Sequence, residues 1–241
     1  SIMSDCGQFA CMHIPVDWTI GYSMSAISSS PMYIIRVFDP ANLPAMELNY
    51  VTFQQMLMGM GFSAMGQGSV TYDDRPMTLN YIQDISPKRI LEAILPLYWT
   101  YQGISCTPTR IDSIKHSDLY DRLKRIFART IMQMTIGMPV MVDAGDLVAM
   151  YRCNALTMKV FFDYTWSRMQ LPNMISDSIA GSILIKRLPL GKETMYDSII
   201  DSIVSTISVS ISWIYRAYQN LMRQVMNIRR QITKIILQDI R

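Results

Sequence analysis

Apolar side chains recur every three to four residues near the C-terminal end, and this periodicity constrains the fold more than any other feature of the sequence. From Ile200 onward, alternating steps of four and three residues meet an apolar or aromatic side chain eleven times in succession. A repeat of 3.5 residues is typical of helices that wind around a partner, because it keeps one seam facing that partner. The seam residues are Ile200, Val204, Ile207, Ile211, Ile214, Tyr218, Leu221, Val225, Ile228, Ile232 and Ile235.

Three structures are compatible with this seam. Ile at most of the seam positions favours a trimer or a larger helical bundle over a dimer. The flanking positions, such as Ile203 and Tyr215, are apolar rather than charged, so a long helix packed in the chain's own core is a second candidate. The third is a strand followed by a shorter helix, because residues 202–212 are rich in Ser, Thr, Val and Ile, which are poor helix formers. Of the three, we expect the oligomeric bundle.

Charge is divided unevenly along the chain. Residues 1–109 carry 4 basic and 8 acidic side chains, whereas residues 110–241 carry 18 basic and 11 acidic ones. A basic half favours an anionic neighbour, which is a nucleic acid, a lipid surface or the acidic part of another copy. The candidate side chains for an anion contact are Arg216, Arg223, Arg229, Arg230 and Lys234, and the alternative, which we favour, is that they form a solvated face of a helix.

Four segments have the composition of strands. Residues 32–38, 47–53 and 77–83 are rich in β-branched and aromatic residues or alternate between apolar and polar ones. Residues 157–166 have the same character later in the chain. The sequence therefore predicts strands in the first third of the chain and one more after its middle.

Two segments in the middle of the chain predict helices. Ser86 followed by Pro87 is typical of a helix start, and we expect Pro96 to interrupt or to end that helix. Residues 117–130 place Leu, Ile and Phe on one face and basic residues elsewhere, which is typical of an amphipathic helix.

Together these elements predict an α+β fold with a β-rich N-terminal portion, a helical middle and a long C-terminal helix. We expect a globular domain over residues 1–190 and a helical oligomerisation segment over residues 191–241. The longest uncharged run near the C-terminal end, residues 202–215, is shorter than the roughly 20 apolar residues that a transmembrane helix needs. We therefore expect no transmembrane span, and the N-terminal residues do not have the pattern of a signal peptide.

Residues that could carry chemistry are few. Cys6, Cys11, Cys106 and Cys153 lack the paired spacing of a zinc site, and the chain contains none of the common phosphate-binding or hydrolase motifs. We therefore expect reduced, metal-free cysteines in a reducing environment, either inside a cell or in a virion. We likewise expect no catalytic residue, no cofactor and no metal ion.

Two further stretches invite a structural interpretation. Asp143 and Asp146 flank a glycine, and we expect them in a solvated turn rather than in a metal site. Residues 56–66 are rich in Met and Gly, and we expect them to be a loosely packed loop or helix buried at a subunit interface. The alternative is an apolar loop that inserts into a membrane or a partner groove.

The function that the sequence favours is a non-enzymatic structural or assembly protein that acts as a homo-oligomer, with other structural proteins as candidate partners. The composition, rich in Met, Ile, Ser, Asp and Arg, suggests a viral capsid or outer-shell component. The alternative is a protein that binds nucleic acid or a membrane surface through its basic C-terminal segment.

Overall fold

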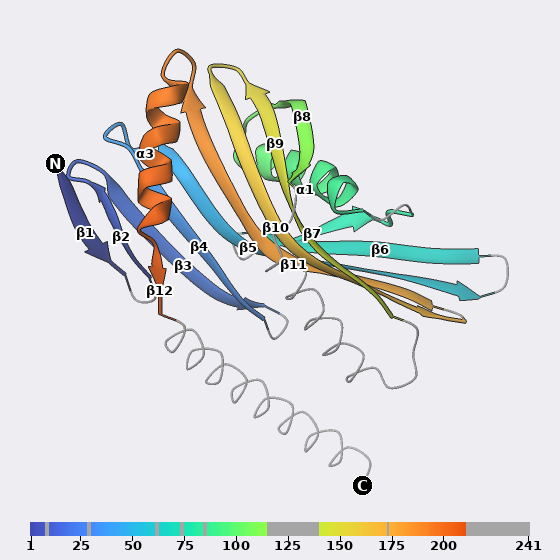
Figure 1. The fold of residues 1–241 in the computed structure, drawn as a ribbon. Helices are drawn as coiled ribbons and strands as arrows, with labels where there is room; N and C mark the ends of the chain where they lie inside the picture. The colour runs from blue at the N-terminus through green and yellow to red at the C-terminus, as the bar shows by residue number, and fades with distance from the viewer. Residues whose placement is uncertain are drawn as a thin grey trace, which may run out of the picture.

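Antiparallel strands make up most of the residues that the structure describes (Figure 1). The structure is a computed structural model, and it describes residues 1–7, 10–27, 30–60, 63–72, 75–83, 86–114, 140–172 and 174–210. Within these ranges the chain forms a large sheet, a small sheet and two helices.

The large sheet has nine strands in the order β3-β4-β5-β11-β10-β9-β8, with β6 paired to β5 and β7 paired to β6. Its strands are β3 (Thr19–Ile27), β4 (Ser30–Phe38), β5 (Pro44–Met60), β6 (Ser63–Tyr72), β7 (Arg75–Asn80), β8 (Thr107–Ile114), β9 (Val140–Cys153), β10 (Leu156–Leu171) and β11 (Met174–Pro189). The long strand β5 is the branch point, because one of its edges pairs first with β4 and then with β6, while the other pairs with β11.

The small sheet consists of β1 (Ile2–Cys6), β2 (Ala10–Pro15) and β12 (Ser208–Val209), with β2 in the centre. The helices are α1 (Pro87–Tyr101) and α3 (Glu193–Ser205). Figure 1 shows α3 lying across the large sheet next to the small one, with α1 at another part of the large sheet. Within the described residues, neither helix is both long and apolar enough to cross a membrane.

The two helices cover opposite faces of the large sheet. Side chains alternate along a strand, and on β11 Ile183 and Ile185 pack with α1, whereas Leu184 and Leu188 pack with α3 and β2. The α1 core also contains the aromatic residues Phe53, Tyr98, Trp99, Tyr151 and Phe162. The α3 core contains Met12, Ile14, Trp18, Ile35, Val37, Met46, Ile200 and Ile203.

The predicted strands and the predicted start of the first helix are confirmed. The predicted strands at 32–38, 47–53 and 157–166 fall within β4, β5 and β10, and most of 77–83 falls in β7. Ser86 is the N-cap of α1, where its hydroxyl accepts a hydrogen bond from the backbone N–H of Arg89, and Pro87 opens the helix as expected.

Of the two alternatives for Pro96, an end of the helix is wrong, because α1 continues through this proline to Tyr101. A proline inside a helix removes one backbone hydrogen bond and crowds the preceding turn. Pro96 lies on the exposed side of α1, where water can hydrate the carbonyl that loses its donor. Tyr98 and Trp99, buried directly after it, give the last turn apolar contacts that offset the loss.

The expected long C-terminal helix is also wrong for the residues that the structure describes. The helix ends at Ser205, and Ser208–Val209 pair with Cys11 and Ala10 of β2 as strand β12. Thr206 closes the helix, because its hydroxyl donates to the Ile203 carbonyl and accepts from the backbone N–H of His13. In residues 202–212 the Ser, Thr and β-branched side chains favour a helix only weakly, so this cap and the strand pairing decide the conformation.

The predicted α+β class with a helical middle is therefore corrected to a mostly β-sheet fold with two short helices in the described residues. The predicted helix at 117–130 lies outside the described residues. A coiled coil finds no support in this architecture, and the expectation of a capsid or virion component, which accompanied it, is corrected as well.

All four cysteines form disulfides, so the expectation that they are reduced is wrong. Cys6 pairs with Cys11 across the β1–β2 hairpin, and Cys106, just before β8, pairs with Cys153 at the end of β9. Spacing in the sequence did not reveal these bonds, because each depends on two strands being antiparallel neighbours. Disulfides of this kind form and persist in oxidising compartments.

Two other expectations are changed by the strands. Asp143 and Asp146 lie within β9 and not in a turn. The Met- and Gly-rich stretch 56–66 contributes the end of β5 and the start of β6, which pair with each other. Met56 is exposed, and residues 61–62 between the strands lie outside the described residues.

Candidate functional site

A groove lies between α3 and the strands β9 and β10. The turn after β11 places the helix there: Gly191 adopts a positive φ of 79°, which a residue without a Cβ adopts readily. The backbone N–H of Leu190 donates to the Ala155 carbonyl at 3.0 Å, which ties this turn to the neighbouring β9–β10 turn. The chain therefore reverses sharply, and α3 runs back over the face of the large sheet opposite α1.

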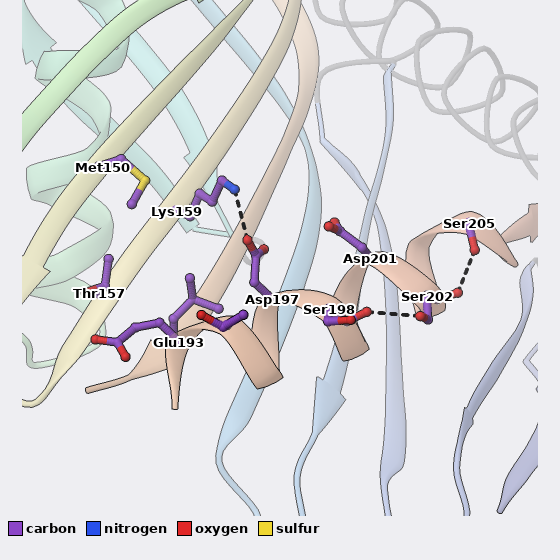
Figure 2. Close-up of a pocket in the computed structure, with 11 residues that line it drawn as sticks. Met150, Thr157, Lys159, Glu193, Asp197, Ser198, Asp201, Ser202 and Ser205 are labelled. Atoms are coloured by element: carbon purple, nitrogen blue, oxygen red, sulfur yellow. Dashed lines mark hydrogen bonds and ion pairs between the residues drawn. The ribbon is translucent and has the colours of Figure 1, made fainter. Parts of the chain in front are cut away.

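The groove has a volume of about 780 Å³ (Figure 2). It is lined by Met150, Thr157, Lys159 and Leu188 from the strands and turn, and by Glu193, Thr194, Asp197, Ser198, Asp201, Ser202 and Ser205 from α3. Figure 2 shows Lys159 and Asp197 pointing toward each other between the sheet and the helix. Helix and sheet therefore contribute opposite charges to the same hollow.

Two lysines of the sheet are clamped by one carboxylate of the helix. Lys159 of β10 and Lys186 of β11 are direct cross-strand neighbours, an arrangement of like charges that is unfavourable by itself. Asp197 offsets the repulsion, because its two carboxylate oxygens accept from Lys186 at 2.7 Å and from Lys159 at 3.0 Å. Lys186 is only 1% exposed, and it also contacts the carboxylate of Asp201. Both ammonium groups lie near the ring of Phe161, at 5.4 and 5.1 Å from its centroid.

Burial alone raises the pKa of the Asp197 carboxyl. The hydrogen bonds and positive charges of Lys186 and Lys159 outweigh burial and hold this pKa below its ordinary value. Asp197 therefore stays ionised well into the acidic range, and the ion pairs that fix α3 on the sheet persist there.

Two other carboxylates that line the groove, those of Glu193 and Asp201, form fewer ion pairs than Asp197. Glu193 has no ion-pair or hydrogen-bond partner in the described part of the chain, although it is partly buried. The Asp201 side chain is 65% exposed, and only one of its oxygens meets Lys186. Glu193, Asp197 and Asp201 are four residues apart, so they follow one face of α3.

The groove continues toward the edge of the sheet. A second hollow of about 430 Å³ shares Lys159 and Met150 and extends to Arg110 and Asp112 of β8. Arg110 and Asp112 form an ion pair with each other on the exposed surface. The two hollows therefore adjoin at Met150 and Lys159 and extend from α3 to β8.

Contacts within the chain hold several of these side chains in place. The lysines are held in ion pairs, and the hydroxyls of Ser202 and Ser205 donate to the carbonyls of Ser198 and Ser202 within α3. Their positions are thus fixed before a ligand arrives, which lowers the entropic cost of binding. Among the described residues, no group of three or more His, Cys, Asp or Glu side chains is placed to hold a metal ion.

The residues singled out from the sequence lie elsewhere. Of the expected seam, Ile200 is buried, and Val204 and Ile207 pack in the same α3 core. The seam residues Ile211, Ile214, Tyr218, Leu221, Val225, Ile228, Ile232 and Ile235 lie outside the described residues, as do Arg216, Arg223, Arg229, Arg230 and Lys234.

The groove residues were missed in the sequence. One signal was present, since the spacing of Glu193, Asp197 and Asp201 places three carboxylates on one face of a helix. Lysines inside two long apolar strands were a second signal, because a buried lysine needs an anionic partner.

Comparisons with known proteins add little. No protein-family model and no curated protein matches the chain. Among solved structures, the chain is similar to LpqN, described as involved in cell envelope biogenesis of Mycobacterium tuberculosis, with 11% identity over 87% of this chain and 84% of that one. The TM-score of 0.20 is too low for this similarity to support an argument about fold or function.

Proposed function

We propose that this chain is a non-enzymatic assembly protein that acts as a homo-oligomer, with copies meeting at the edge strand β3. The observation that carries the proposal is the contrast between β3 and β8, the strands at the two ends of the main strand order of the large sheet. In the described part of the chain, β3 pairs only with β4 and β8 only with β9. An outer strand presents unpaired backbone groups that a second chain can bind.

Only one of these edges is protected. Strand β8 contains Pro108, Arg110 and Asp112 and a bulge at its start, which are the usual devices that prevent edge pairing. Strand β3 has nine residues with no proline and no charged side chain. Pairing of two β3 strands about a twofold axis would continue the sheet from one copy into the next.

The groove at α3 supports a binding role over catalysis, because Lys159, Lys186 and Asp197 are engaged in fixing the helix on the sheet. The earlier preference for a trimer or larger assembly depended on a coiled coil, so the number of copies is not part of this proposal. The disulfides favour assembly in an oxidising compartment.

Sedimentation velocity of the full chain tests the proposal. We expect a mass that is a multiple of 27.7 kDa and that rises with concentration. Ser23→Lys adds a charge to β3 and should dissociate the assembly, whereas Ser113→Lys, the matched change on the protected edge, should leave it intact. A wild-type chain that is monomeric at every concentration, or equal effects of the two variants, would contradict the proposal.

The second candidate is a protein that binds an anionic polymer or surface through its C-terminal arginines. It stays a prediction from the sequence, because those residues lie outside the described residues.

A further inference from the structure

We infer that the groove between α3 and the sheet binds the basic C-terminal segment, residues 211–241, of a second copy of the chain. The inference rests on the proposed function, since it requires copies that associate. The groove would form a second contact between copies, in addition to the pairing of β3 strands, and residues 211–241 would be the part of the neighbour that it binds.

The first argument is the state of the carboxylates on α3. Asp197 and Asp201 together balance the two lysines beneath them, whereas Glu193 has no counter-charge among the described residues. Asp201 binds Lys186 through one oxygen only, and its side chain is 65% exposed. At 1.5 Å per residue, Glu193 and Asp201 are about 12 Å apart along the helix. The groove therefore carries one unbalanced carboxylate, Glu193, and one partly engaged carboxylate, Asp201, on either side of Asp197.

The second argument is the surface between them. Thr157, Thr194 and Ser198 contribute hydroxyls, and Met150 and Leu188 contribute apolar contacts. Arginine is suited to a surface that combines carboxylates, hydroxyls and apolar atoms. Its guanidinium donates to carboxylates and hydroxyls, and its aliphatic stem packs on apolar atoms. The groove is thus suited to basic side chains with long stems.

The third argument is charge complementarity within the chain itself. Residues 211–241 carry six basic side chains and one acidic one, whereas residues 1–210 carry 16 basic and 18 acidic ones. Each copy therefore has a positive segment and a negative remainder. A groove in one copy that binds the segment of another gives a head-to-tail contact, which forms a ring or extends an assembly.

The position where the described chain ends fits a contact between copies. Strand β12 leads away from α3 along β2, and β2 lies on the side of α3 away from the groove strands β9 and β10 (Figure 1). The described chain thus ends on one side of α3, and the groove lies on the other. The groove of a neighbour is reached without the segment crossing its own helix.

Charge exchange in the full chain tests this inference by sedimentation at low and at high salt. Glu193→Lys reverses one groove charge, and Arg229→Glu with Arg230→Glu reverses two charges of the segment. Each variant alone should weaken self-association about tenfold at low salt and remove most of its salt dependence. An equimolar mixture of the two variants should associate more strongly than either alone, because the reversed charges are again complementary.

Two further variants are controls for loss of association through unfolding or through a general change of charge. Glu193→Gln with Asp201→Asn keeps hydrogen-bonding groups of the same size, so it should weaken association without unfolding the chain. Glu92→Lys reverses a charge on α1, which covers the opposite face of the large sheet, and should leave the salt-dependent association unchanged.

The outcomes separate this inference from the proposed function. If Ser23→Lys dissociates the assembly but the groove variants do not alter it, the groove inference is wrong and the proposed function stands. If the arginine variants leave association unchanged but lose retention on a heparin column, the segment binds an anionic polymer and the inference is wrong. A wild-type chain that is always monomeric contradicts both.

Discussion

The side-chain amide of Gln55 forms two hydrogen bonds with the backbone of Ile82, in the way that the backbone of a neighbouring strand would. Its Nε2 donates to the Ile82 carbonyl at 2.9 Å, and its Oε1 accepts from the Ile82 N–H at 3.0 Å. The same Nε2 donates to Asp177, which also binds Arg168 through both of its oxygens. Gln55 on β5 thus fixes the segment that leads from β7 to α1, and it is only 3% exposed.

Replacing Gln55 with leucine should lower the free energy of unfolding by about 2–4 kcal/mol, because it leaves the backbone groups of Ile82 without their buried partners. Urea denaturation measures the change. Gln54→Leu is the matched control, since Gln54 is exposed on the opposite face of β5, and it should change stability by less than about 0.5 kcal/mol. Equal losses at the two positions would mean that the hydrogen bonds of Gln55 contribute nothing specific.

Local signals in the sequence predicted local structure well. Ser86 and Pro87 marked the start of α1 because a cap and a fixed φ act within one turn. Strand composition located β4 and β10 for the same reason. The heptad pattern failed after Ser205, where residues 206–209 depend on Thr206 meeting His13 and on pairing with β2.

The site could not be predicted, because it joins residues that are distant in the sequence. Asp197 meets Lys159 and Lys186 only after β10 and β11 pair and α3 folds back over them. The bond between Cys106 and Cys153 likewise requires β8 and β9 to be neighbours. Periodicity and spacing describe one segment at a time and do not indicate which segments meet.

The two disulfides should contribute different amounts to the free energy of unfolding. Cys106–Cys153 closes a loop with a sequence separation of 47, and Cys6–Cys11 closes one of 5. In the chain-entropy treatment these loops correspond to about 4 and about 2 kcal/mol. Unfolding of the paired Cys→Ser variants should show the larger loss for Cys106 and Cys153, and losses in the reverse order would contradict the assignment.

Accessibility should separate the same two bonds. Cys6 is exposed, whereas Cys153 is only 3% exposed. Mild reduction followed by thiol alkylation and mass spectrometry should therefore label Cys6 and Cys11 first. Simultaneous labelling of all four cysteines in the folded protein would show that Cys106–Cys153 is not protected by the fold.

Stability should depend on pH through Asp197. The pKa of this carboxyl is lower in the folded protein than its ordinary value of 3.8, so its ionised form stabilises the fold at neutral pH. That contribution should be lost as the pH falls below about 4 and through the folded-state pKa. Urea unfolding from neutral to acidic pH should show a smaller decline for Asp197→Asn than for the wild type. Parallel declines would mean that the ion pairs with Lys159 and Lys186 contribute no pH dependence.

Gly181 should be the least replaceable glycine of the large sheet among those whose surroundings the structure describes. It lies in β11 opposite Tyr164, and a Cβ at this position would overlap the backbone carbonyl of Asp163 on β10. A backbone atom inside a paired strand cannot move without breaking the strand pairing, so the overlap cannot be relieved cheaply. Gly181→Ala should therefore lower the free energy of unfolding by at least about 2 kcal/mol.

Gly21→Ala is the matched control for this change. Gly21 also lies in a strand of the large sheet, but the nearest atom to its added Cβ is a ring carbon of Phe38 at 3.3 Å, which can shift by rotation of the side chain. Both substitutions restrict the unfolded chain equally, so the difference between them isolates the backbone overlap. We expect Gly21→Ala to change the unfolding free energy by less than about 1 kcal/mol. Similar values for the two variants would mean that β10 and β11 are not as close at Gly181 as the structure places them.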